Sequence, residues 1–388
     1  MNERLTIIED RVAQCRAALI VNGDVRRLWF GPSNDDPNFA ALPTEGKRFV
    51  GRVRKVDKTI GAAFIDIGIG DDGFLNLTDA SAAVVNEGSF TILEVVAPAR
   101  QSKGPTLRFI GLEEKSRAIG PVNVETSAVS AARILQAGDA ALLTDSVKVQ
   151  SALSNVGFNA EVWTKNQSLF SHYGVDSICE DVFSKHAPIA GGGALIIDEA
   201  HALIAIDVDT GGLPASSAPR LREKIALAGA YEAARQIMLR NLSGRIVIDF
   251  PSIDARSRRR CATAVIEAMN AVDRVGSISW SGRGLLQMTR RRFGPSLLEM
   301  ATEPGDETPT PGRRYTLDWE ARRLLVEAEN RLRNRPGGRL FIRAGSLLAE
   351  YIASKLWMDT LNEKYPARIL LEASSEMKDR DSDITEQR

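Results

Sequence analysis

The stretch "GGGALIIDEAHALIAIDVDTGG", residues 191–212, decides the fold of this chain. Three glycines open it, and the apolar run Ala194–Ile197 follows directly. A short segment at residues 199–201 then separates this run from a second one, which ends in Asp207 and Asp209. Short apolar runs bounded by glycine and polar residues predict two adjacent β-strands joined by a tight turn.

The carboxylates of this region are the first candidates for a functional site. Period-two alternation places Ala205, Asp207 and Asp209 on one face of the second strand. A further apolar strand, "RIVIDF" at residues 245–250, carries Asp249 near its end, and we expect this strand to be buried on both faces. A lone aspartate at the end of an apolar strand is costly to bury, so a partner is expected.

Two interpretations of Asp207 and Asp249 stay open on spacing alone. On adjacent strands they would suit Mg²⁺, which binds one or two carboxylates plus waters. Nearby arginines would then supply a phosphate-binding rim, and the chemistry would be metal-assisted phosphodiester hydrolysis. In the alternative interpretation the aspartates are strand-end caps and salt-bridge partners of arginines.

The letters of Asp198–His201 also spell the Walker-B box of ATP-driven helicases. Such a motor needs a phosphate-binding loop of the form GxxxxGK[ST]. Gly46–Arg48 lacks the upstream glycine and the hydroxyl residue, and Lys103–Gly104 has the order reversed. An ATP-driven motor is therefore not favoured.

Composition sets wide limits on the class of protein. A length of 388 residues predicts two to three domains. The 50 basic and 50 acidic residues balance, so the net charge says nothing about binding partners. The three cysteines, Cys15, Cys179 and Cys261, are far apart, which fits a reducing cytoplasm and no disulfide framework. No CxxC pair occurs, so no zinc is expected, and neither a signal peptide nor an apolar run of membrane-spanning length is found.

A small β-barrel is predicted from residue 46 onward, where short β-rich runs alternate with glycine and aspartate turns. Phe64 and Phe74 lie among the cations of this region. Exposed, they would be stacking platforms for bases, and buried, they would be ordinary barrel core. Composition alone favours the core.

The other elements follow from periodicity and capping signals. We expect a hairpin around Asn22–Asp24 and a strand in "AALLTD". We expect helices at residues 127–138, 218–239, 256–269 and 317–335, the last capped by Thr316. Residues 301–313 are predicted to be a linker, and the polar tail from Ser374 is predicted to be disordered.

Five stretches carry a combined signal: "LFSHYGVDSICEDVF" at 169–183, the opening stretch at 191–212, "EAARQIMLRNLSGRIVIDF" at 232–250, "RVGSISWSGRGLLQMTRRRFGPSL" at 274–297 and "GAAFIDIGIGDDGFLNL" at 61–77. Together they resemble the bacterial ribonuclease E/G family, endoribonucleases of RNA turnover and rRNA processing that cut single strands. The resemblance covers most of residues 15–300 in order, and its motifs are specific only in combination.

The resemblance implies an α/β multidomain fold. An OB-fold barrel would be inserted in an RNase H-like subdomain, followed by a DNase I-like α/β catalytic subdomain and a small C-terminal α/β domain. The expected boundaries are 1–44 and 113–189 for the RNase H-like subdomain, 45–112 for the barrel, 190–300 for the catalytic subdomain, 301–315 for the linker, 316–373 for the small domain and 374–388 for the disordered tail.

The family's catalytic residues carry over by position. Its two magnesium-binding aspartates fall on Asp207 and Asp249, and Asp209 would orient the metal or the attacking water. An arginine near the family's active site falls on Arg274. The hairpin turn implied at residues 198–201 makes His201 a turn residue rather than a catalytic base.

The family's RNA-binding barrel residues fall on Phe64, Phe74 and Lys103, the last in "QSKGPTL" at 101–107. The resemblance therefore favours RNA contact over a core role for the two phenylalanines. The implied ligands are Mg²⁺ and single-stranded RNA.

Four departures from the family pattern bear on these expectations. Asp209 stands where the family has asparagine, and the zinc-link cysteines are missing after "GPSLLEM". The segment 110–169 is short and shows no match to the pocket that senses a 5′ monophosphate, and "SGRGLL" replaces an arginine-phenylalanine-glycine sequence. They argue against a zinc-linked tetramer, leave a dimer open, and predict no strong preference for 5′-monophosphorylated RNA.

The functional expectation is a compact, G-like, Mg²⁺-dependent endoribonuclease of the cytoplasm that leaves 5′-phosphate and 3′-hydroxyl ends. The alternative is an RNA-binding protein of the same fold with weak or lost nuclease activity. Cleavage assays with RNA separate the two.

Overall fold

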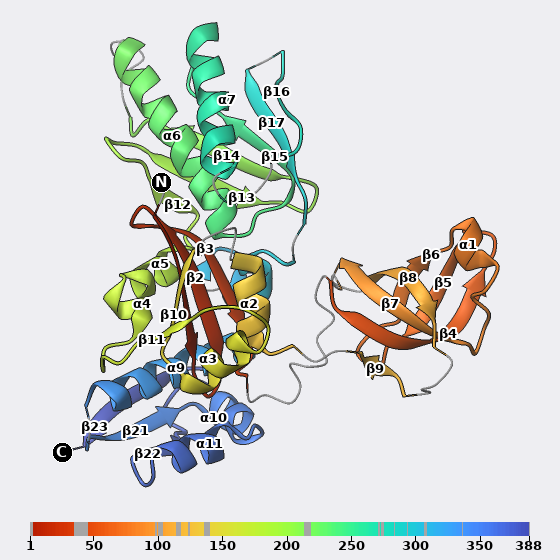
Figure 1. Ribbon diagram of the computed structural model, residues 1–388. Coiled ribbons are helices and arrows are strands. Elements are labelled where there is room, and N and C mark those ends of the chain that lie inside the picture. The colour runs from red at the N-terminus through yellow and green to blue at the C-terminus, as the bar shows by residue number, and fades with distance from the viewer. Residues whose placement is uncertain are drawn as a thin grey trace. The chain divides into compact units, whose positions relative to one another are not determined.

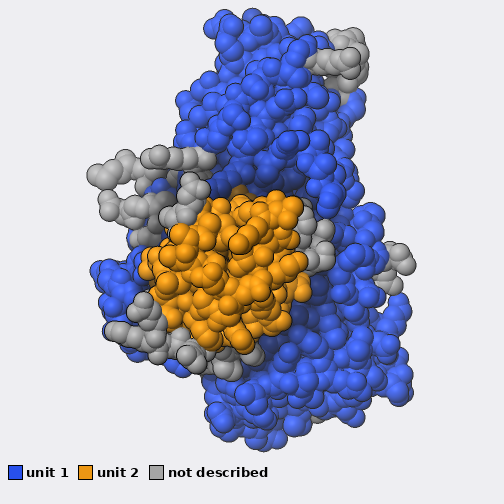
Figure 2. All heavy atoms as spheres, turned by 90° about the vertical axis from the view of Figure 1, so that its right-hand side faces the viewer, with its two compact units in different colours: residues 1–35, 127–291, 296–388 blue, residues 36–126, 292–295 orange. Residues whose placement is uncertain are grey.

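The protein is a multidomain, mixed α/β chain with several separate sheets. The computed structural model describes all residues except 1–2, 35–45, 98, 100–103, 114–117, 123–124, 136–139, 213–218, 271, 273–274, 283, 293, 306–308, 336 and 388. The chain divides into two compact units, coloured separately in Figure 2. Unit 1 comprises residues 1–35, 127–291 and 296–388, and unit 2 comprises residues 36–126 and 292–295.

The first sheet of unit 1 has the order β11-β10-β1-β2-β3 (Figure 1). Its strands are β1 (Arg4–Asp10), β2 (Cys15–Val21), β3 (Asp24–Gly31), β10 (Ala141–Thr144) and β11 (Glu161–Val162). Strands β1 to β3 form an antiparallel meander, and β10 and β11 continue it in parallel. The hairpin expected at Asn22–Asp24 is confirmed, because Asn22 and Gly23 have φ angles of 53° and 85°, as a two-residue turn of type I′ requires.

Four helices accompany this sheet: α2 (Ser127–Leu135), α3 (Val147–Ser154), α4 (Leu169–His172) and α5 (Val175–Asp181). Helix α2 contacts β1, β2 and β3, and α4 contacts β1. The predicted strand in "AALLTD" is β10, and the predicted helix from residue 127 is α2. The expected end of that helix at Gly138 lies outside the described residues.

The second sheet of unit 1 contains the stretch that opened the sequence analysis. Its order is β12-β13-β14-β15-β17-β16, with β14 and β15 parallel. The strands are β12 (His186–Pro188), β13 (Ala194–Glu199), β14 (Ile204–Asp209), β15 (Gly244–Asp249), β16 (Ile278–Trp280) and β17 (Leu285–Arg290). Helix α6 (Pro219–Leu239) connects the parallel strands, and α7 (Ala255–Asn270) packs beside it (Figure 1).

The predicted linker at residues 301–315 is wrong. After helix α8 (Leu297–Ala301), which Ser296 caps, three short strands form a sheet of order β18-β20-β19. They are β18 (Thr302–Pro304), β19 (Pro309–Thr310) and β20 (Arg313–Tyr315). Arg313 donates to the hydroxyl of Thr302 at 2.6 Å, so backbone pairing and one guanidinium order a segment whose composition is typical of a loop.

The C-terminal part of unit 1, which we call the C-terminal domain, begins with helix α9 (Leu317–Asn334), capped by Thr316 as predicted. It continues with β21 (Arg339–Ala344), α10 (Ser346–Ala353), α11 (Trp357–Lys364), β22 (Ile369–Ala373) and β23 (Ser382–Gln387). Its sheet has the order β22-β21-β23.

The predicted disorder of residues 374–388 is wrong, because β23 pairs antiparallel with β21 along its whole length. Its composition is polar because an edge strand needs few inward side chains, and here Ile384 packs against the domain core.

Unit 2 is a β-barrel with strands β4 (Arg48–Asp57), β5 (Ala62–Asp66), β6 (Gly73–Asn76), β7 (Phe90–Ala97), β8 (Thr106–Leu112) and β9 (Gly120–Pro121). The order β5-β6-β8-β7-β4 closes on itself through pairing of β4 with β5, and α1 (Asp79–Ala82) lies between β6 and β7 in sequence. Strand β9 pairs with β4, so the unit continues past residue 112, the boundary that the sequence predicts. Phe49, Ile65, Leu75 and Leu93 are among the residues of its core.

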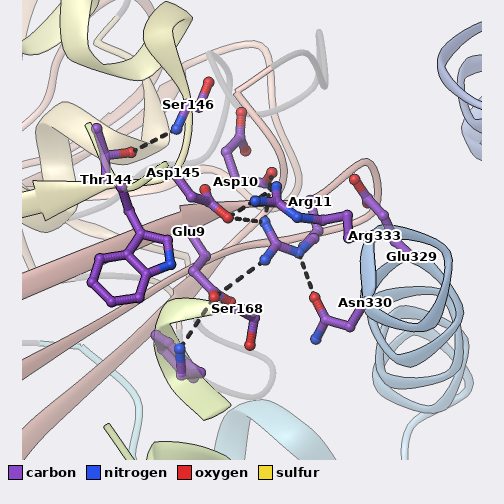
Figure 3. Close-up of polar contacts among 12 residues, drawn as sticks. Glu9, Asp10, Arg11, Thr144, Asp145, Ser146, Ser168, Glu329, Asn330 and Arg333 are labelled. Atoms are coloured by element: carbon purple, nitrogen blue, oxygen red, sulfur yellow. Dashed lines mark hydrogen bonds and ion pairs between the residues drawn. The ribbon is translucent and has the colours of Figure 1, made fainter. Parts of the chain in front are cut away.

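A cluster of buried charges lies at the end of β1 in unit 1 (Figure 3). The carboxylate of Glu9 is fully buried and lies 3.1 Å from Nη2 of Arg11 and 2.7 Å from Nε of Arg16. It also accepts the backbone N–H of Phe170 at 3.1 Å. The cluster therefore joins the first two strands to helix α4.

Arg11 extends the cluster to the C-terminal domain. Its Nη1 lies 2.6 Å from the buried carboxylate of Asp145, and its Nε donates to Asn330 on α9 at 2.7 Å. Arg333, also on α9, lies 3.1 Å from the same Asp145 carboxylate. Segments from the start, the middle and the end of the chain thus share one ionic network.

The network sets the ionisation of Glu9. Burial alone would raise the pKa of Glu9, but the guanidiniums of Arg16 and Arg11 and the N–H of Phe170 outweigh it and lower the pKa from 4.5 to about 2. The stabilisation that follows is complete above pH 4.5 and is lost as the pH falls through about 2.

Replacing Glu9 with Gln should lower the free energy of unfolding of unit 1 by about 3–5 kcal/mol, because two buried guanidiniums each lose one of their carboxylate partners. Urea unfolding followed by tryptophan fluorescence measures this, since all five tryptophans lie in unit 1. The control is Asp24→Asn, which breaks an exposed pair with Arg26 and should cost less than about 1 kcal/mol. Equal losses in the two variants would contradict the assignment.

Candidate functional site

The second sheet of unit 1 is covered on one face and exposed on the other. Ile206 and Val208 of β14 are buried, as are Ile246 and Ile248 of β15, and helix α6 packs on this side, with Gly229 against Val208. The alternate residues of β14, Ala205, Asp207 and Asp209, are exposed, as the alternation predicted. We call this exposed side the open face of the sheet.

The expectation that residues 245–250 form a strand buried on both faces is wrong. Arg245 and Asp249 of β15 are exposed, and Val247 between them is half-buried. Val247 is apolar but belongs to the open face, because β-branched residues favour strands even where burial is incomplete.

Asp207 and Asp249 are direct partners in the pairing of β14 with β15. Neighbouring strands lie about 4.8 Å apart, so parallel pairing in this register brings the two carboxylates to one place on the open face. Neither carboxylate forms an ion pair with any residue that the structure describes. The alternative interpretation, in which arginine salt bridges neutralise them, therefore has no support in the described part of the chain.

The electrostatics of the pair are unfavourable. The pKa of Asp207 is raised by partial burial, then by the negative charges of Asp249 and Asp209, and only its contact with the N–H of Val208 opposes this. These like charges lie on one face without a cationic partner and repel one another. A bound cation would reduce this repulsion.

Asp209 ends β14 and has a local structural role. Its Oδ1 accepts the N–H of Gly211 at 3.0 Å, which fixes the turn after the strand. A Cβ at Gly193 would lie 2.3 Å from the carbonyl oxygen of Asp209, so glycine is required where β13 begins beside this turn. This turn contact could not be predicted from the sequence, because an aspartate near glycines fits a ligand or a turn equally well.

The chemistry of the donors fits a hard cation. Within the described ranges, no group of three or more His, Cys, Asp or Glu side chains is arranged to hold a metal ion. Two carboxylates alone remain, and Mg²⁺ commonly takes one or two carboxylates and completes its shell with water and substrate oxygens. Arg274, the fourth predicted catalytic residue, lies outside the described residues.

The four residues Asp198–His201 do not form one site. Asp198 pairs with Lys185 at 2.5 Å, and Glu199 accepts the hydroxyl of Ser296 at 2.5 Å. His201 is exposed in the turn that the N–H of Ala200 closes by donating to Leu203. The expectation that His201 is a turn residue is confirmed.

The predicted RNA-binding phenylalanines lie side by side on the barrel of unit 2. Phe64 of β5 is opposite Phe74 of β6, and the ring centroids are 5.9 Å apart in an edge-to-face arrangement. Both rings are half-buried, alternate with core residues such as Ile65 and Leu75, and are outside the barrel core. The core interpretation that composition favoured is therefore wrong.

A cation adjoins this aromatic pair. Lys55 of β4 is opposite Phe64, its side chain is 64% exposed, and its Nζ lies 3.8 Å from the carboxylate of Asp57. Arg54 next to it is engaged with Asp66 at 2.8 Å and Asp72 at 3.3 Å. Lys103, the third predicted barrel residue, lies outside the described residues.

The sequence of the sheet with the open face matches a known family. Residues 128–293 match the model of the ribonuclease E/G family, and this range contains Asp207, Asp209 and Asp249. The chloroplastic ribonuclease E/G-like protein of Arabidopsis thaliana is 33% identical over 165 residues, which is 41% of this chain and 16% of that protein. Residues 128–293, which make up less than half of the chain, are therefore similar to the ribonuclease E/G family.

Two bacterial relatives complete the comparison. Ribonuclease E of Escherichia coli K12 is 35% identical over 156 residues, covering 38% of this chain and 14% of the relative. Ribonuclease G of the same strain is 30% identical over 142 residues, covering 35% and 29%. The matches thus span less than a third of each relative, and the family match begins after the barrel, which includes Phe64 and Phe74.

Replacing Asp209 with Asn should lower the pKa of Asp207 toward its ordinary value, because one of the two nearby negative charges is removed while the turn keeps its oxygen acceptor. NMR titration of ¹³C-labelled aspartate carboxyls in metal-free protein measures the change. The control is Asp198→Asn, which removes a carboxylate that already has a cationic partner and should leave Asp207 unaffected. An unchanged pKa in Asp209→Asn would contradict the described electrostatics.

Proposed function

We propose that this protein is a metal-dependent endoribonuclease that cleaves single-stranded RNA in RNA processing or decay. The supporting observation is the register pairing of Asp207 with Asp249, two exposed carboxylates that form no ion pair with a described residue. They lie within the segment that matches the ribonuclease E/G family. The products would be 5′-phosphate and 3′-hydroxyl ends.

In this proposal Asp207 and Asp249 hold Mg²⁺ on the open face. When bound there, the ion would lower the pKa of a bound water and neutralise charge at the phosphorus. Asp209 keeps the turn after β14 in place through Gly211 and adds negative charge beside Asp207. Arg274 is proposed to act near the same site on the strength of the family resemblance.

The barrel would hold the substrate strand. Phe64 and Phe74 offer ring surfaces on which unpaired bases stack, and Lys55 and Lys103 would attract the backbone. The closed five-strand order, with a short helix after the third strand, supports an OB-fold, in which the second and third strands commonly bind oligonucleotides. Phe64 and Phe74 are on these two strands.

The finer fold assignments in unit 1 are also proposals. The order β3-β2-β1-β10-β11, an antiparallel meander continued by parallel strands, supports an RNase H-like subdomain. The six-stranded sheet with helices on one face supports a DNase I-like catalytic subdomain.

A second candidate function is RNA binding with weak or absent cleavage. Asp209 favours it, since a third carboxylate beside the pair adds repulsion where the family has a neutral asparagine. The local geometry opposes it, because the oxygen that Asp209 gives to Gly211 is one that asparagine also has. The nuclease is therefore our preferred function.

We propose a cytoplasmic location, in line with three free cysteines of which Cys15 and Cys261 are buried. No helix in the described part of the chain has both the length and the apolar character to cross a membrane.

Cleavage of a labelled, A/U-rich single-stranded RNA tests the nuclease. Activity should require Mg²⁺, disappear in EDTA, and fall at least about 100-fold in Asp207→Asn and Asp249→Asn, because each removes one of two metal-binding carboxylates. The control is Asp198→Asn, which removes a carboxylate of the same sheet that Lys185 already neutralises and should retain activity. RNA binding without cleavage by the natural protein would favour the second function, and cleavage that survives both substitutions would overturn the proposed site.

Replacing Phe64 or Phe74 with Ala should weaken binding of single-stranded RNA by about 1–3 kcal/mol per ring, since each ring is proposed to stack on a base. Fluorescence anisotropy with a labelled oligoribonucleotide measures the change. Val96→Ala removes an exposed apolar side chain elsewhere on the barrel and should leave binding unaffected. A loss equal to that of Val96→Ala would remove the phenylalanines from the binding surface.

A further inference from the structure

A pocket of about 200 Å³ opens beside Asp249, at the carboxyl end of β15. The segment after β15, the first turns of α7 and the hairpin of β16 and β17 form its walls. They include Phe250, Ile253, Arg258, Trp280 and Gly284. Apart from Asp249, the proposed function uses none of these residues.

Arg258 is the only cation among the described residues that line this pocket, and it forms no ion pair with Asp249, which lines the same pocket. Its guanidinium lies 5.7 Å from the ring centroid of Trp280 and forms neither a hydrogen bond nor an ion pair with any described residue. The side chain is half-buried. A guanidinium carries five N–H donors, so a partly buried one without acceptors favours an anionic ligand.

The direction of this guanidinium is fixed by its neighbours. Trp280 packs against Phe250 with ring centroids 5.6 Å apart, which holds the surface on which Arg258 lies. On the other side, a Cβ at Gly284 would lie 3.0 Å from Nη2 of Arg258, and Gly284 has a φ of 91°. Glycine therefore allows the turn between β16 and β17 to approach the guanidinium, and the binding group is organised before a ligand arrives.

The chemistry of the pocket favours a phosphate over a base. Arg258 already lies over the ring of Trp280, so that face is not free for a base. The pocket is smaller than the range of about 300–1,000 Å³ typical of drug-sized ligands. The planar fork of arginine matches the oxygens of a phosphate in a bidentate way.

We propose that this pocket is a phosphate-binding subsite for RNA, in which Arg258 binds the phosphodiester next to the bond that is cut. The proposal rests on the proposed function, because RNA is its ligand. Arg258 then places the strand so that the reacting phosphate faces Asp207 and Asp249 on the neighbouring strand ends.

Salt-dependent RNA binding by the full chain tests the subsite. Anisotropy of a labelled single-stranded RNA is measured in EDTA over a series of KCl concentrations, so that cleavage plays no part. Arg258→Gln should weaken binding about tenfold and reduce the slope of log K against log[KCl] by about 0.7, the contribution of one phosphate contact to a single strand. Arg258→Lys keeps the charge and should keep the slope.

Two further variants make the test specific. Arg260 is an exposed arginine two residues further along α7, on nearly the opposite side of the helix, so Arg260→Gln removes the same charge and should leave the slope at the natural value. Ser252 is an exposed residue of the pocket, and Ser252→Asp should reproduce the effect of Arg258→Gln by giving the guanidinium an internal partner. This variant keeps the test valid if Arg258→Gln folds poorly.

The outcomes separate the subsite from the proposed function. An unchanged slope in both Arg258→Gln and Ser252→Asp overturns the subsite, and an equal reduction in Arg260→Gln shows a diffuse charge effect that also overturns it. A loss of affinity that does not depend on salt would mean contact with a base and would overturn the phosphate assignment. If the natural protein binds RNA with the expected slopes but does not cleave it, the nuclease fails and the subsite stands, whereas no RNA binding at all overturns both.

Discussion

The burial of the Glu9 carboxylate is the constraint on which the architecture of unit 1 depends. A carboxylate without solvent is stable only if cations reach it, and Arg11 and Arg16 satisfy this from the turn and the strand that follow. Each arginine then needs further partners, and Asp145 and Asp176 supply them from distant segments. The N–H of Val12 donates to the buried Glu329 of α9, so the small C-terminal domain is bound to the same turn.

The first sheet, which contains Glu9, packs together with the second sheet, which carries the candidate site. Helix α6 contacts β3 of the first sheet and also β13 and β14 of the second. Side chains of both sheets, Leu19 and Ile206 for example, belong to one hydrophobic cluster. The buried face of the second sheet is therefore anchored in this shared core, while its open face presents the two like charges. Repulsion between Asp207 and Asp249 costs stability that a bound cation would return.

The sequence predicted the elements correctly where a residue pattern is compatible with a single local structure. Alternation in "ALIAIDVD" placed Asp207 and Asp209 on one face, and Thr316 capped its helix as expected. Register was beyond reach, because the pairing of Asp207 with Asp249 depends on the crossover through α6. Composition failed where backbone pairing ordered polar segments, as in β20 and β23. It also failed for Phe64 and Phe74, since only barrel closure decides which face of a strand is inside. The unpaired state of Arg258 depends on the positions of all its neighbours, which no local pattern encodes.

The insertion of unit 2 between β3 and α2 has a consequence for biosynthesis. Glu9 and Arg11 are synthesised early. Asp145, Asp176 and Asn330 of the same network are synthesised only after the whole barrel. Unit 2 is built almost entirely from the continuous segment 36–126. The barrel can therefore fold as a unit before the partners of the first hairpin have been synthesised. Contacts of more than 300 residues' separation, such as that of Arg11 with Asn330, make completion of unit 1 slow and late. A nascent chain that stops before α9 would leave the charged turn after β1 without its C-terminal partners and exposed to chaperones and proteases.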